Sequence, residues 1–184
     1  MKKLMLLILV AAFAANGLMA QKFFTRDGKV SFYSDAPLEK IEAHNNSATS
    51  VIDTESGRLE FAVLIKGFQF EKALMQEHFN ENYMESSKYP KAVFKGQITN
   101  LEAINFSQDG TYTAQVSGEI TIHGVTQPLE TTATIVVKDG LFKAEAKFQL
   151  NVADFKIEIP GVVREKIAKT VLVTVQCDYQ PFNR

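Results

Sequence analysis

Polar and apolar residues alternate along most of this chain, in runs that are each short. The clearest run is 142–150, where apolar residues occupy every second position and charged or polar residues lie between them. A period of two places one set of side chains on each face of a β-strand. Comparable runs predict strands at 58–65, 92–99, 112–122, 129–137 and 170–179, glycine-containing turns at 55–57, 108–110 and 138–140, and loops at 123–128 and 154–169.

The N-terminal third carries weaker strand signals. Residues 23–33 predict a hairpin with Asp27-Gly28 as its two-residue turn, because this dipeptide accepts the left-handed conformations of tight turns. Two short strands are expected at 41–44 and 48–52. The turn-prone residues Asn45-Asn46-Ser47 are expected to separate them.

About eight to ten antiparallel strands joined by hairpins predict an all-β fold, either a sandwich or a closed barrel. Closure is favoured because a long open edge such as 142–150 would invite aggregation. The expected architecture is an extended antiparallel eight-stranded β-barrel. A barrel of this size has just enough interior for side chains or one small ligand.

One stretch, at roughly 70–87, has a helical period instead. Its apolar side recurs at three- and four-residue steps through Leu74, Met75, His78, Phe79 and Tyr83. The dipeptide Tyr89-Pro90 is expected to end the helix, since the residue before a proline is driven out of the α region. A lone amphipathic helix must bury its stripe. We expect it to cover one end of the barrel and help enclose an apolar cavity, or else to pack as an ordinary core helix.

The first twenty residues have the three parts of a secretory signal peptide. A basic start, Met1-Lys2-Lys3, precedes an apolar run that ends in the small-residue stretch Gly17-Leu18-Met19-Ala20. We predict a signal peptide at 1–20 with cleavage after Ala20, one domain at 21–184, and a periplasmic or secreted location. Gln21 follows the cut, where a lipoprotein would carry cysteine.

Composition narrows the function classes. Without Lys2 and Lys3 the chain has 18 basic against 21 acidic residues, so no basic surface is expected to attract nucleic acid. Phenylalanine is abundant, at 14 residues, and tryptophan is absent. No further segment is long and apolar enough to cross a membrane. The single cysteine, Cys177, cannot form an internal disulfide, and its role stays open.

The candidate site is apolar. Inward-facing large residues alternate with small ones such as Gly96, Gly118, Ala144 and Ala146 on the same strand faces. This pattern can either fill a barrel or leave a tunnel for a long hydrocarbon, which needs few polar contacts. The candidate lumen residues are Phe61, Val63, Phe79, Tyr83, Phe94, Ile98, Ile120, Ile122, Phe142, Phe148, Leu150 and Val173.

Catalytic and metal-binding signals are weak. His44, His78 and His123 lack the spacing of a zinc motif, and no nucleophile elbow or phosphate loop occurs. We therefore predict no metal site, no cofactor and no enzymatic activity. The alternative is that the protein is an enzyme that acts on a lipid in the pocket through His78 or His123.

Two motifs give the chain a family resemblance. They are Lys88-Tyr-Pro-Lys-Ala-Val-Phe-Lys-Gly96, preceded by His78-Phe79, and Val116-Ser-Gly-Glu-Ile-Thr-Ile-His-Gly-Val-Thr-Gln-Pro128; the stretch from Phe148 to Phe155 also fits. The chain resembles the YceI-like family of lipid- and polyisoprenoid-binding proteins. That resemblance implies a lipocalin-like barrel with an isoprenoid in its lumen, and it makes Phe79, Tyr83 and Phe94 pocket candidates. Many members have Arg-x-Asp-Phe where this chain has Asn151 or Val152.

The expected function is that of a periplasmic or secreted binding protein for a polyisoprenoid or similar long apolar lipid. A structural or stress-related envelope protein with a filled core is a further alternative, and cavity volume separates the two. No nucleic-acid partner and no integral membrane segment are expected, and a homodimer stays open. The identity and length of the ligand lie beyond the sequence.

Overall fold

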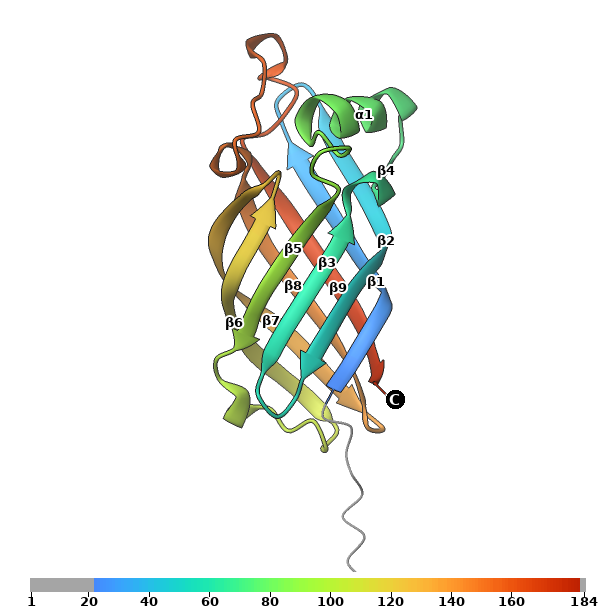
Figure 1. Cartoon of the computed structure of the whole chain (residues 1–184), viewed down its shortest axis with the longest axis vertical. Coiled ribbons are helices and arrows are strands. Elements are labelled where there is room, and N and C mark those ends of the chain that lie inside the picture. The colour runs from blue at the N-terminus through green and yellow to red at the C-terminus, as the bar shows by residue number, and fades with distance from the viewer. Residues whose placement is uncertain (1–21, 183–184) are drawn as a thin grey trace, which may run out of the picture.

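A computed structural model describes residues 22–182, so the predicted signal peptide and its cleavage site lie outside the described residues. Eight long strands close into one antiparallel barrel in the order β1-β9-β8-β7-β6-β5-β3-β2, and β2 pairs back with β1 (Figure 1). The predicted eight-stranded barrel is therefore confirmed. The barrel strands are β1 Lys22–Asp35, β2 Lys40–Asp53, β3 Arg58–Leu64, β5 Lys91–Ile98, β6 Gly110–Ile122, β7 Val125–Lys138, β8 Leu141–Asn151 and β9 Thr170–Pro181.

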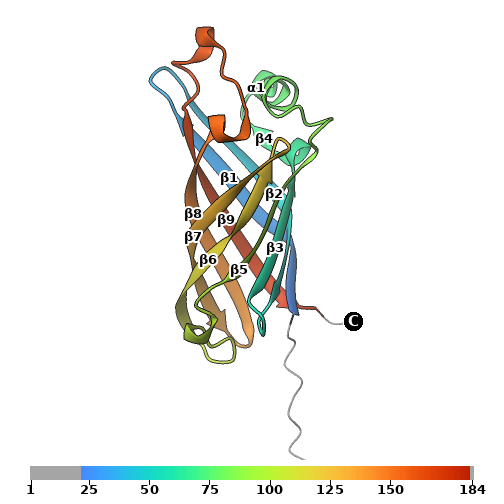
Figure 2. The same cartoon turned by 60° about the vertical axis from the view of Figure 1, so that its left-hand side comes forward.

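The two ends of the barrel differ. One end, here called the mouth end, carries the β1–β2 loop (36–39), the β3–β5 segment (65–90) and the β8–β9 segment (152–169). Figures 1 and 2 both show these segments at the end where the helix α1 (Ala73–His78) lies. The opposite end, here called the far end, carries the turns after β2 and β7 and the last residues of β9. No helix within residues 22–182 is long and apolar enough to cross a membrane.

The predicted hairpin at 23–33 is wrong. Residues Lys22–Asp35 form one continuous strand, and its register against β2 shifts between Thr25 and Gly28. A Cβ atom on Gly28 would lie 3.0 Å from the carbonyl oxygen of Ala48 and 3.2 Å from the Cys177 sulfur. Glycine is needed here because strands β2 and β9 approach it closely, so Asp27-Gly28 marks a bulge instead of a turn.

The predicted turn at Asn45-Asn46-Ser47 is also wrong, because β2 runs unbroken from Lys40 to Asp53. The Asn45 side chain is buried, and its Nδ2 donates a 2.9 Å hydrogen bond to the Leu64 carbonyl. Its Oδ1 accepts a 2.9 Å bond from the Ser47 backbone N–H. The side chain thus supplies hydrogen bonds where the pairing of β1 and β2 is irregular. The turn propensity of asparagine alone does not distinguish such a site from a reversal of the chain.

The predicted helix at roughly 70–87 is shorter in the structure. The two-residue strand β4 (Gln69–Phe70) pairs with β2 and occupies its start. The α-helical part, Ala73–His78, continues as one π-helical turn over Phe79–Tyr83. Glu85 then adopts φ 42°, so the helix ends in a left-handed residue before Tyr89-Pro90 is reached.

The predicted loop at 123–128 is largely strand. His123 and Gly124, with φ values of 51° and 74°, form the two-residue turn between β6 and β7, and β7 begins at Val125. The strand contains Pro128, which cannot donate a ladder hydrogen bond. It is tolerated because β7 pairs with β8 only from Ala133 onward, which leaves the first half of β7 with one strand neighbour.

Candidate functional site

A cavity of about 570 Å³ lies inside the barrel. Inward side chains of all eight barrel strands line it, joined at the mouth end by α1 and the β8–β9 segment. The lining is overwhelmingly aliphatic and aromatic. Both the volume and the character of the lining fall in the range of small-molecule sites, which typically span roughly 300–1,000 Å³.

The structure brings nearly all of the predicted lumen residues together. Of the twelve, eleven line this cavity: Phe61, Val63, Phe79, Tyr83, Phe94, Ile98, Ile120, Ile122, Phe148, Leu150 and Val173. Phe142 does not, because it lies below the cavity in the packed core. The sequence reasoning missed Phe32, Phe68 and Phe70 on the cavity wall. Phe32 was assigned to a hairpin arm, and the other two precede the helix without a strand period.

Small residues explain why the middle of the barrel is hollow. Ala114, Ala133 and Ala146 lie side by side on β6, β7 and β8 and all face the cavity. On β5 and β6, Gly96 pairs with Gly118. A Cβ on either glycine would lie within 2.8 Å of the Phe94 ring, so that ring rests directly on the glycine pair and not across the lumen.

The cavity ends at Tyr179 near the far end. The Phe142 ring stacks on Tyr179 at 4.8 Å and contacts Phe23 at 4.9 Å and Phe106 at 5.0 Å between centroids. Only Tyr179 of these four rings lines the cavity. The Tyr179 hydroxyl shares a 2.7 Å hydrogen bond with Ser50, whose hydroxyl also bonds the Glu60 carbonyl at 2.9 Å. Burial holds the Tyr179 pKa well above its ordinary value, so the closed end is neutral.

Aromatic packing attaches the helical segment to the barrel wall at the mouth end. The Phe79 ring stacks on Phe32 at 5.5 Å and contacts Phe70 at 5.0 Å and Phe68 at 5.7 Å. Leu74 on α1 is 61% exposed, although it lines the cavity. The helix therefore presents its apolar stripe to the cavity opening, where burial also raises the pKa of Tyr83.

Polar contacts tie the mouth-end segments to one another. Lys72, which directly precedes α1, forms a 3.2 Å ion pair with Glu39 of the β1–β2 loop. The Leu38 N–H donates to the Glu165 carbonyl at 2.9 Å, and the Ala168 N–H donates to Ser34 at 2.9 Å. These contacts join the β1–β2 loop to the β8–β9 segment. The opening is thus framed by linked segments and not by independent loops.

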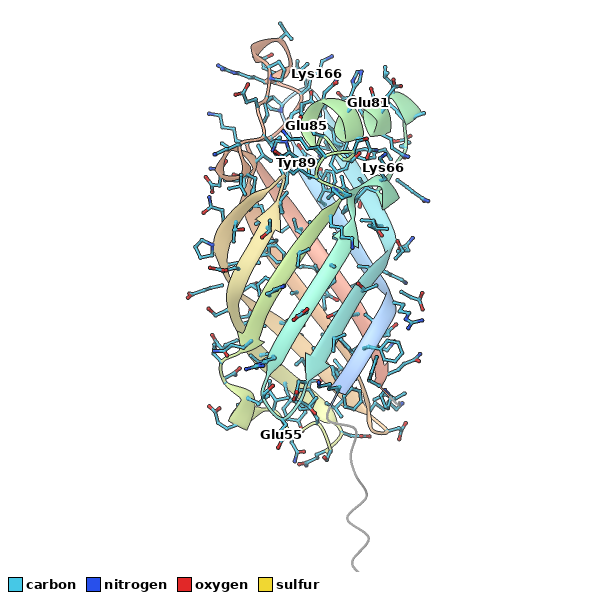
Figure 3. All side chains as sticks on the ribbon, in the orientation of Figure 1. Glu55, Lys66, Glu81, Glu85, Tyr89 and Lys166 are labelled. Carbon is cyan, nitrogen blue, oxygen red and sulfur yellow. The ribbon has the colours of Figure 1, made fainter. Side chains whose placement is uncertain are left out.

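Charged and polar side chains that line the cavity are concentrated at this same end. Ser34, Glu39, Lys72, His78 and Lys166 belong to the mouth-end segments or to the strand end beside them. Figure 3 shows Lys166 at the end of the barrel where Glu81 and Glu85 lie, opposite Glu55. A bound molecule with a polar group would keep that group at the mouth and place its apolar part inside.

The β8–β9 segment also completes the barrel wall. Above the pair Ala133–Ala146, β7 and β8 have no ladder hydrogen bonds to each other. The 3₁₀ turn Val152–Phe155 lies against both strands there, and Gln127 Nε2 donates a 2.9 Å bond to the Asp154 carbonyl. Asn151 or Val152 stands where many relatives are expected to carry arginine, and Asn151 caps this turn. Asn151 therefore has a local structural role.

The histidines do not converge. His123 is mostly buried; its Nε2 lies 2.8 Å from Glu85 Oε2, and its Nδ1 lies 3.1 Å from the Phe155 carbonyl oxygen. It does not line the cavity, whereas His78 does. His44 is exposed beside Glu42. Within residues 22–182, no cluster of His, Cys, Asp and Glu has the composition of a metal site.

Cys177 is a buried free thiol beside Ala144, in the row at the deep end of the cavity. Burial raises its pKa to about 12, so the thiol is protonated at neutral pH. A thiolate is the reactive form of cysteine. The residue therefore acts as a small core side chain.

Comparison with known proteins agrees with this architecture. The YceI-like domain family matches the chain over residues 21–179. A polyisoprenoid-binding domain from Saccharophagus degradans, implicated in plant cell wall breakdown, superposes with a TM-score of 0.77 at 13% identity and covers 88% of this chain and 99% of its own. BcnA from Burkholderia cenocepacia gives a TM-score of 0.67 at 16% identity, with 83% and 96% covered.

A third solved structure, the YCEI protein of Campylobacter jejuni, gives a TM-score of 0.52 at 18% identity, with 75% and 84% covered. The search of curated proteins gives no match. The three structural neighbours establish a shared fold, and the family match spans the whole barrel. This chain belongs to the YceI-like family.

Proposed function

We propose that this protein is a periplasmic or secreted carrier that holds a polyisoprenoid or similar long apolar lipid in the barrel lumen. The observation that supports the proposal most directly is the 570 Å³ cavity, whose lining is overwhelmingly apolar and whose charged groups lie mostly at the mouth. A filled core, as expected of a purely structural envelope protein, does not have such a space. The polyisoprenoid-binding neighbour has the same fold.

The mechanism is exclusion of water. Each CH₂ group moved from water into an apolar interior gains roughly 0.8 kcal/mol, so a long hydrocarbon needs no charged anchor inside the lumen. The polar end of the molecule stays near Lys72, His78 and Lys166 at the mouth. Leu74 and Phe79 on the helical segment then cover the entrance.

The binding proposal is tested by mass spectrometry of organic extracts of the purified protein, followed by rebinding of an isoprenoid alcohol after delipidation. Ala133→Leu adds volume inside the lumen, and Thr134→Leu places the same new side chain on the outer face of the same strand. We expect the first variant to lose binding and the second to keep it. Absence of any lipid in the extract, together with no rebinding by the wild-type protein, would refute the proposal.

The location is tested separately. We expect the protein recovered from a periplasmic or secreted fraction to have the intact mass of a chain that starts at Gln21. A mass that retains residues 1–20 would contradict export with cleavage after Ala20.

A further inference from the structure

The cavity stops at one specific level of the barrel. Its deepest lining residues include Ile135, Ala144 and Tyr179. The inward residues directly below, Val137 and Phe142, are each 2% exposed and do not line it. The change from hollow to filled therefore occurs within one step along the strands.

Strand register shows how the sequence produces this step. On β6, β7 and β8 the row Ala114–Ala133–Ala146 is made of small side chains, followed by Val175 on β9, and leaves space. The next row toward the far end contains Ile135, Ala144 and Cys177, and the row after that contains Val137, Phe142 and Tyr179. Side-chain volume increases from row to row, and the aromatic pair Phe142–Tyr179 fills the barrel cross-section together with Phe23.

We propose that Phe142 and Tyr179 form a floor that sets the maximum length of isoprenoid chain the lumen accepts. The inference rests on the proposed function. Four of the five charged or ionisable His, Lys and Glu side chains in the lining, Glu39, Lys72, His78 and Lys166, lie at the mouth, so the hydrocarbon tail enters first and points to the floor. The Tyr179 hydroxyl is already paired with Ser50 at 2.7 Å, so the floor offers the tail end an apolar surface.

A floor has a measurable consequence for a ligand series. Each isoprene unit that still fits inside the lumen should raise affinity by at least about tenfold, because its apolar surface leaves water. A unit added after the tail has reached Tyr179 remains outside and adds little. Affinity should therefore rise with chain length to a limit and then level off.

The experiment measures binding of isoprenoid alcohols that grow by one unit at a time to delipidated protein. Phe142→Ala, and Phe142→Leu as a milder change, open space behind Tyr179 and should move the limit to longer alcohols. Ala144→Leu adds volume in the row above Phe142 and should move the limit to shorter alcohols. Lys143→Leu places the same new side chain on the exposed outer face of β8, where it lines no cavity, so it should keep the wild-type limit.

The outcomes separate the two proposals. If the wild-type protein shows a limit and the limit is identical in Phe142→Leu and Ala144→Leu, the floor is refuted while the carrier function stands. If the wild-type protein binds no alcohol of any length, the proposed function itself fails. If Phe142→Ala fails to fold, the other variants replace it. Ala144→Leu removes no packing atoms and tests the floor by itself.

Discussion

The Glu85 carboxylate lies 2.8 Å from Nε2 of His123, and both residues have positive φ values, 42° and 51°. The other ring nitrogen of His123 faces the Phe155 carbonyl oxygen at 3.1 Å. Carboxylate and carbonyl oxygens are both acceptors, so each ring nitrogen of His123 faces an acceptor. One side chain on the β6–β7 turn thereby joins the end of the helical segment to the β8–β9 segment.

Loss of this contact should loosen the helical segment. Glu85→Ala is expected to increase opening of residues 79–90 by roughly fivefold, corresponding to about 1 kcal/mol for a partly exposed charged hydrogen bond. Hydrogen exchange of that segment and the ligand dissociation rate report the change. Glu81→Ala removes the same charge from the same segment and should leave both rates near wild type; equal effects of the two variants would assign the result to charge alone.

Gly118→Ala should destabilise the barrel by about 2 kcal/mol or more. The new Cβ would lie 2.4 Å from the Lys95 carbonyl oxygen and 2.5 Å from the Gly96 Cα, and backbone atoms cannot yield easily. It would also press on the Phe94 ring and push it toward the lumen. Urea unfolding measures the loss. Gly161→Ala meets no atom within 4 Å and serves as the control, with an expected change near zero.

Ser50 and Tyr179 should show strong energetic coupling. Ser50→Ala leaves the buried Tyr179 hydroxyl without its 2.7 Å partner and is expected to cost about 1–3 kcal/mol. Tyr179→Phe removes that hydroxyl, so the double variant should be more stable than the sum of the two single changes implies. A double-mutant cycle of unfolding free energies tests this, and strict additivity would contradict it.

Alkaline pH should destabilise the protein through Cys177. Burial raises the pKa of the folded thiol from 9.0 to about 12, so its contribution is complete below pH 9 and is lost as the pH rises toward 12. Between about pH 8 and about pH 10.5 this amounts to a loss of about 2 kcal/mol. Cys177→Ala should show a correspondingly shallower decline in unfolding free energy over that interval, and identical slopes would remove the thiol as the cause.

Strand periodicity predicted most of the barrel because each strand has one face toward the interior and one toward water. The run 142–150, with inward Phe142, Ala144, Ala146 and Phe148, is an example that the structure reproduces as β8. The same periodicity cannot say how deep an inward residue lies. Phe142 and Phe148 share one strand face, yet one plugs the barrel and the other lines the cavity.

The N-terminal errors have a different cause. Asp27-Gly28 and Asn45-Asn46-Ser47 have turn chemistry, and both occur where β1 and β2 change register against each other. Whether such residues reverse the chain or absorb a bulge depends on partners distant in sequence, here Ala48, Leu64 and Cys177. Local propensity carries no information about those partners. The contacts of His123 at the mouth end are likewise long-range. The local sequence His123-Gly124 indicates a turn but does not indicate these contacts.

The rings of Phe142, Tyr179 and Phe23 pack against one another and close the barrel at one end. Under the proposed carrier function, a bound lipid would have to leave by the mouth through which it entered. Uptake and release would then use the same opening, so a donor and an acceptor could not be served at the same time. Such a carrier would deliver one molecule per cycle.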